Sequence, residues 1–253
     1  MVAGVVALGV LTACTTRAEI TRPRGTIVVQ TPDVRPTAVS PPTSPPPRPS
    51  PIRLAGCHPR TDTIAVRDPS AATTARVTRA WRRIDAWLDA HAPRSARSLR
   101  NPAPDASIAR LQTRLGRPLP PDLVTSLRVH DGADATTAAA FTFPPFHVPM
   151  SARDVGREWR MMCGVVEDLG TQNPGDWKPA FTPFAQAGDG GELYADHTGQ
   201  VGEYFAEDGT HTDGYPASYA AFLETTATLL ETGRPGPSGF RAHPHDGVLD
   251  WKP

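Results

Sequence analysis

The chain has 253 residues with 26 basic and 26 acidic side chains, so its formal net charge at pH 7 is zero. This balance lacks the electrostatic signature of a nucleic-acid-binding protein, and no apolar run approaches the roughly 20 residues of a membrane-spanning helix. The 29 prolines and 21 glycines, beside 39% hydrophobic residues, indicate one ordinary core joined to a segment that does not fold.

The first 13 residues are expected to be a lipoprotein signal peptide. Val2–Ala13 is apolar or small, which suits a secretory h-region and is too short to cross a bilayer. It ends in Leu11-Thr12-Ala13-Cys14, which resembles a bacterial lipobox with Cys14 as the lipidated residue. The basic n-region is missing, so the true start codon stays open, and a buried strand beside an incidental cysteine is the alternative. We expect a lipid-anchored protein on the extracytoplasmic face of the cell membrane.

Residues 14–69 are expected to be a disordered, proline-rich linker. Residues 31–51 hold nine prolines, which favour the polyproline II conformation of a semi-rigid spacer. The segment has no periodicity from which to build a core. Its arginines outnumber its acids, which suits a stalk near an anionic leaflet. Recognition of the proline run by a partner module is the alternative.

Two cysteines remain if Cys14 carries a lipid. Cys57 and Cys163 would then lie in an oxidising compartment, where they can form a disulfide. In the alternative, Cys163 is a small buried hydrophobe, because it lies between Trp159 and Val166 on an apolar helix face. No Cys-x-x-Cys is present, which disfavours a redox motif or a cysteine-rich zinc site.

Helical periodicity dominates the first part of the folded region. Val77, Trp81, Ile84 and Leu88 form one stripe between Ser70 and Pro93. Further helices are expected over 105–115, from Pro120 to His130, from Ser151 as N-cap, and from Pro216 or Ser218 to Thr232. The Trp and Met residues on these stripes are interpreted as core rather than as cofactor ligands.

Short strands are expected after Trp177. Ala180–Ala185, Glu192–Ala195 and Val201–Phe205 are separated by turns rich in Gly and Asp, which predicts an antiparallel meander. Helices, then strands, then a helix indicate an α+β fold. One domain is expected over residues 70–233, followed by a C-terminal tail over 234–253.

The order of motifs in this region resembles the SUKH superfamily, which includes the fungal Smi/Knr cell-wall regulators linked to killer-toxin resistance. The resemblance covers roughly residues 77–233. It rests on Ile108–Leu115, Arg117–Leu123, Leu127, His130-Asp131-Gly132, Pro183-Phe184-Ala185, Gly188–Gly191, Leu193, Asp196, Gly199-Gln200-Val201, Ser218-Tyr219 and Phe222-Leu223. The chain departs from the family pattern at Asp131, where Asn is usual, and over residues 136–151, which are rich in Ala and Pro.

The resemblance implies a non-catalytic α+β module that binds other proteins. Bacterial relatives are commonly immunity proteins that neutralise secreted toxins. The family defines no shared catalytic residues, so none can be transferred to this chain.

The residues themselves agree with a non-enzyme. No Gly-x-Ser-x-Gly, His-Glu-x-x-His, Walker or Rossmann motif is present. His243 and His245 near Asp246, and His197 and His211 on turns, are weak metal candidates. We therefore expect no catalytic residues, no metal and no cofactor. A catalytic triad or carboxylate pair whose members are far apart in the sequence would leave no motif, because such residues come together only in the folded protein.

The strongest functional signal is an acidic segment. No Lys or Arg occurs between Lys178 and Arg234, whereas carboxylates and aromatic residues recur there. Such a surface attracts a basic protein, and Tyr and Trp often anchor interfaces. The alternative is that the acids only solvate hairpin turns. The predicted binding residues are Trp177, Asp189, Glu192, Tyr194, Asp196, Glu203, Tyr204, Glu207 and Asp208.

We expect an envelope-anchored, immunity-type protein whose partner is a basic toxin domain. The first alternative is a cell-envelope scaffold or regulator that binds proteins of cell-wall synthesis. The second is a surface lipoprotein enzyme with an unrecognised site.

Overall fold

The computed structural model describes residues 50–58, 62–170 and 175–253. The chain divides into two units, residues 1–46 and 47–253, and all described residues belong to the second. The predicted signal peptide, Cys14 and most of the predicted linker lie outside the described residues. The second unit mixes helices with antiparallel sheet, which confirms the predicted α+β class.

The predicted helices all form, close to their expected bounds. Serines cap three of them: the side chains of Ser70, Ser151 and Ser218 each accept a hydrogen bond from the amide three residues on, as N-caps do. The helices are α1 (Ala71–His91), α2 (Pro93–Ala96), α3 (Asp105–Leu115), α4 (Pro121–Leu127), α5 (Ala152–Leu169) and α6 (Tyr219–Thr232), preceded by the 3-10 helix η1 (Ala55–Cys57).

The strands form the predicted antiparallel meander, with one strand added at each of its two edges. The sheet order is β1-β2-β3-β4-β5. Gly190, Gly199 and Gly209 adopt positive φ in its turns, where residues with a Cβ are strained. The strands are β1 (Val148–Pro149), β2 (Thr182–Gln186), β3 (Glu192–Ala195), β4 (Val201–Phe205) and β5 (Gly209–His211).

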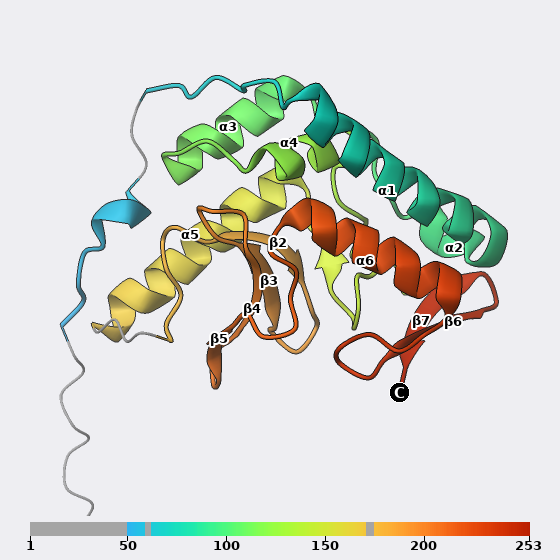
Figure 1. The fold of residues 1–253 in the computed structure, drawn as a ribbon. Helices are drawn as coiled ribbons and strands as arrows, with labels where there is room; N and C mark the ends of the chain where they lie inside the picture. The colour runs from blue at the N-terminus through green and yellow to red at the C-terminus, as the bar shows by residue number, and fades with distance from the viewer. Residues whose placement is uncertain (1–49, 59–61, 171–174) are drawn as a thin grey trace, which may run out of the picture. The chain divides into compact units, whose positions relative to one another are not determined.

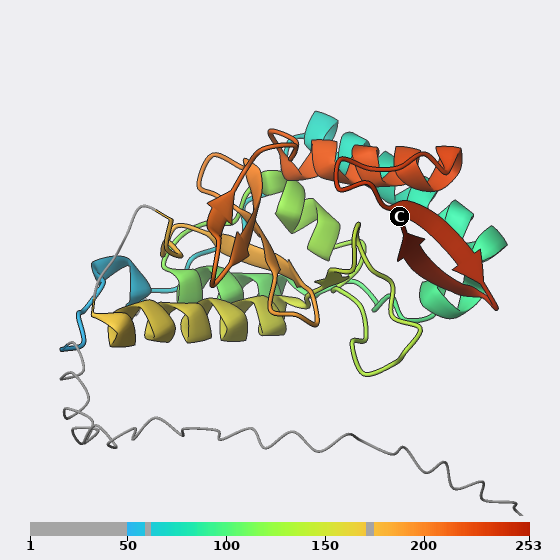
Figure 2. The same cartoon turned by 90° about the horizontal axis from the view of Figure 1, so that it is seen from below.

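Helices cover both faces of the meander, and in Figure 2 the sheet lies between α5 and α6. α3 packs along α5, and α1 packs along α6 (Figure 1). Phe184 of β2 contacts Phe222 of α6, with ring centroids 5.6 Å apart. The buried stripe of α1, including Trp81, joins the same core, and the Trp81 Nε1 donates to Ser126 Oγ at 2.8 Å. No helix in the described ranges is long and apolar enough to cross a membrane.

The C-terminal residues do not form the predicted tail. They fold into a hairpin of β6 (Arg241–His245) and β7 (Val248–Lys252), in which Leu249 and Trp251 are buried. Asp246 and Gly247 both adopt positive φ at its turn, as an Asp-Gly hairpin turn requires. The prediction was wrong because the Pro- and Gly-rich composition concealed this turn signal.

The predicted linker boundary at residue 69 also lies too late in the chain. The Ile52 amide donates to the Glu167 carbonyl at 2.9 Å, and the Ile64 amide donates to Thr113 Oγ1 at 3.0 Å. Cys57 is buried and forms a disulfide with Cys163 of α5. These residues are held by backbone hydrogen bonds and a covalent bond, which produce no hydrophobic periodicity in the sequence.

Loss of this disulfide is expected to destabilise the domain. It closes a loop with a sequence separation of 106 residues, and cross-links of this kind typically contribute about 2–4 kcal/mol to the free energy of unfolding. The urea midpoint of the Cys57→Ala/Cys163→Ala variant should therefore fall. Dithiothreitol should lower the midpoint of the wild type and leave that of the double variant unchanged; equal midpoints for oxidised wild type and variant would contradict the prediction.

Candidate protein-binding surface

Five carboxylates of the acidic segment fall into two structural groups. Two of them stabilise turns: Asp189 Oδ1 accepts from the Gly191 amide at 3.1 Å, and Asp196 Oδ1 accepts from the amides of Thr198 and Gln200. Asp189 and Asp196 therefore stabilise turns, as the alternative interpretation of the acidic segment expects. The other group is exposed in and after the β4–β5 turn and makes no hydrogen bond or ion pair to another described residue: Glu207, Asp208 and Asp213.

We call Glu203, Glu207, Asp208 and Asp213 the acidic edge. Glu203 lies on β4 and is half-buried, whereas the other three are exposed. Two other acids of the Lys- and Arg-free segment, Glu224 and Glu231, pair with Arg76 and Arg83 of α1 at the α1–α6 contact. The carboxylates of this segment that have no partner among the described residues therefore lie in the β4–β5 turn and in the loop after β5.

The predicted aromatic anchors are not on the surface. Trp177, Tyr194 and Tyr204 are 0%, 2% and 7% exposed. The Trp177 ring packs edge-on against both tyrosines, with centroids 6.1 and 5.7 Å apart. The sequence interpretation was wrong because the segment before β2 covers this side of the sheet, so that these aromatic residues fill the core and cannot contact a partner.

Glu192 is also buried, at 2% exposure, and does not belong to the acidic edge. It forms a hydrogen bond with Glu158 of α5, and burial together with this neighbour raises the pKa of Glu192 to about 9. Glu192 is therefore protonated at neutral pH. Within the described part of the chain, Glu158 Oε1 and Glu192 Oε2 have no hydrogen-bond partner. The hydrogen bond between the protonated Glu192 and the carboxyl group of Glu158 joins β3 to α5.

Glu203 is held in place by two side chains on the other side of the sheet. The Tyr215 hydroxyl donates to its Oε2 at 2.6 Å, and the buried His147 places Nε2 3.1 Å from its Oε1. Burial would raise the pKa of Glu203, but the His147 contact and the Tyr215 hydrogen bond outweigh it and hold that pKa below its ordinary value. Glu203 is therefore a fixed negative charge at neutral pH.

A cavity of about 280 Å³ lies beside this carboxylate. Its walls come from a proline loop, the loop after β5, α6 and the loop before β6, and its two acids are Glu203 and Asp213. No basic side chain lines it. Apolar walls with a carboxylate suit the aliphatic stem and charged end of a Lys or Arg from another protein. The cavity residues are Pro144, Pro145, Glu203, Asp213–Pro216, Phe222, Thr225, Thr226, Leu229, Pro237 and Ser238.

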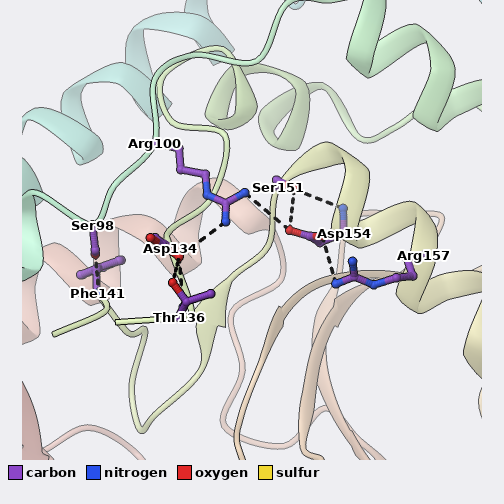
Figure 3. Close-up of polar contacts among 8 residues, drawn as sticks. All are labelled: Ser98, Arg100, Asp134, Thr136, Phe141, Ser151, Asp154 and Arg157. Carbon is purple, nitrogen blue, oxygen red and sulfur yellow. Dashed lines mark hydrogen bonds and ion pairs between the residues drawn. The ribbon is translucent and has the colours of Figure 1, made fainter. Parts of the chain in front are cut away.

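A charged network at the start of α5 fixes the loop before β1 (Figure 3). Arg100 lies 3.9 Å from Asp134 and 3.7 Å from Asp154, and Asp154 also pairs with Arg157 at 3.0 Å. Asp131, at the position where the family pattern has Asn, accepts from the Ala152 amide at 2.6 Å. Asp131 and Asp154 lie at the positive end of the α5 dipole, and the network therefore stabilises the start of this helix.

The histidines form no metal centre: within the described ranges, no three His, Cys, Asp or Glu side chains gather as ligands for an ion. His243 and His245 stack on β6 with centroids 5.9 Å apart, and His197 and His211 are exposed.

Residues 102–227 match the SMI1 / KNR4 family (SUKH-1). The matched region runs from just before α3 into α6, so it contains the whole meander, all of α5 and the first part of α6. The chain therefore carries a domain of the SUKH superfamily. α1 and the C-terminal hairpin lie outside the match, which is narrower than the expected span of 77–233. No curated protein matches the chain.

Because Glu192 is buried, the free energy of unfolding is expected to fall as pH rises from 4.5 to about 9. Its pKa is about 9 in the folded protein against an ordinary 4.5, so the folded state binds the extra proton between these values. The free energy of unfolding therefore falls as pH rises through this window, and the contribution is gone above the folded pKa. Glu192→Gln keeps a neutral hydrogen-bonding group and should flatten the decline.

Urea midpoints across this pH range would measure the effect. Glu207→Gln removes an exposed carboxylate and should follow the wild-type curve. A Glu192→Gln curve that is parallel to the wild type would show that Glu192 does not take up the proton.

Proposed function

We propose that this protein is a membrane-anchored, non-catalytic immunity protein that binds a toxin through the acidic edge of its SUKH domain. SUKH domains bind protein partners, which supports a protein ligand. The observation that carries the proposal is the acidic edge itself: Glu207, Asp208 and Asp213 are exposed and have no partner among the described residues, and Glu203 lines a cavity. Such a surface attracts a basic protein and accelerates its association.

The expected location of the protein outside the cytoplasm restricts the kind of toxin that it can bind. A chain lipidated at Cys14 would meet its partner outside the cytoplasm. The toxin is therefore intercepted during entry or acts on the envelope itself. A basic toxin domain satisfies both the charge of the acidic edge and this route.

Glu207→Lys is expected to lower the affinity for the partner by about tenfold at low salt. The substitution replaces an attractive charge by a repulsive one on the proposed interface. Asp89→Lys, on the exposed end of α1, is the matched control because it changes the net charge equally at a distant site. Binding of the full chain to the product of a neighbouring toxin gene, measured by calorimetry at rising salt, tests both variants. Equal affinities would remove the acidic edge from the interface.

Protection from the toxin provides the functional test. Cells that make the full chain should survive the toxin, cells with Glu207→Lys should be more sensitive, and cells with Asp89→Lys should survive. Cys14→Ala should move the protein from a salt-washed membrane fraction to the soluble fraction, because high salt weakens electrostatic binding to lipid but does not remove a lipid anchor. A salt-washed membrane fraction that retains Cys14→Ala as it retains the wild type would contradict the lipid anchor without affecting the binding test.

A further inference from the structure

The outer face of α5 carries an apolar stripe that no described residue covers. Met161, Val165 and Leu169 follow one another at four-residue spacing and are 45%, 41% and 53% exposed. Within the described ranges the only other exposed large hydrophobic residue is Phe146. Exposed apolar side chains that gather on one helix typically mark a contact with a partner or a membrane.

Arginines lie along the same helix. Arg153, Arg157 and Arg160 are exposed, and the Arg157 side chain is 68% exposed even though it pairs with Asp154. α3, which packs beside α5, adds the exposed Arg110. The solvent-facing side of α5 also carries Asp154, which pairs with Arg157, and the exposed Asp168. The apolar stripe and the three arginines are suited to the interface of a bilayer, where apolar residues enter the headgroup region and arginines meet anionic phosphates.

The root of the predicted stalk lies against α5. Cys57 is bonded to Cys163 in the middle of α5, and the Ile52 amide binds the Glu167 carbonyl one helical turn further on. In Figures 1 and 2 residues 50–58 lie beside the C-terminal half of α5. The chain that leads back to Cys14 therefore leaves the domain beside the C-terminal half of α5, the half of the helix that also carries Val165 and Leu169.

We propose that the outer face of α5 lies on an anionic bilayer surface. The disulfide holds the stalk root against α5, so the domain docks by this face. Glu203 and its cavity lie on the α6 side of the sheet, so this orientation leaves them accessible to a partner. The orientation of the domain on the membrane rests on the proposed lipid anchor. The affinity of α5 for lipid is independent of that anchor.

Vesicle co-sedimentation of the full chain with Cys14→Ser tests the affinity without a lipid anchor. This chain is expected to bind vesicles of equal parts phosphatidylglycerol and phosphatidylcholine more strongly than pure phosphatidylcholine. Arg153→Gln/Arg157→Gln/Arg160→Gln should lower the partition coefficient by about 100-fold at low salt, since each arginine contributes about fivefold near an anionic surface. Val165→Ser/Leu169→Ser should weaken binding to both kinds of vesicle.

The matched control is Arg79→Gln/Arg82→Gln/Arg97→Gln, which removes two exposed arginines from α1 and one from the C-cap of α2. It should bind as the unsubstituted chain does. All chains share the same N-terminal residues, so any difference belongs to the folded domain. Equal loss in both triple variants, or no loss in either, would overturn the proposal. Toxin binding that persists in the α5 variants would leave the proposed function intact.

Discussion

The fold depends on the fixation of α5 at three points along its length. Its N-terminus is held by the Asp131 carboxylate and by the Ser151–Asp154 cap. Its middle meets the sheet through Glu158 and Glu192, and Cys163 joins it covalently to the segment before α1. Because α5 covers one face of the meander, these restraints also fix the sheet on which the acidic edge lies.

This arrangement assigns separate tasks to the two sides of the sheet. The α5 side contains the aromatic residues around Trp177 and the buried carboxyl pair, so its interior is closed and its exterior is the apolar and basic face of α5. On the α6 side, Glu203 lines a cavity. A domain anchored from the α5 side can therefore present its acidic side to an incoming protein.

The carboxylates of the strand region illustrate how the environment changes the role of one residue type. Glu192 is desolvated and holds its proton, whereas Glu203 keeps its charge because His147 and Tyr215 contact it. Asp196 accepts hydrogen bonds within a turn, and Glu207 faces solvent. Only the charged and accessible members of such a series can attract a basic partner, because a protonated carboxyl group adds no net charge to the external field.

The sequence by itself determined the helices, the meander and the family of this protein. These features depend on local patterns, because the apolar stripe around Trp81, the serine caps and the glycine turns each involve residues that are close in the sequence. Tertiary structure decided which strand residues are accessible, since β3 is covered on both faces and alternation cannot tell Glu192 from Glu203. It also decided the pairing of Cys57 with Cys163 and the docking of the C-terminal hairpin, because both depend on contacts between residues far apart in the chain.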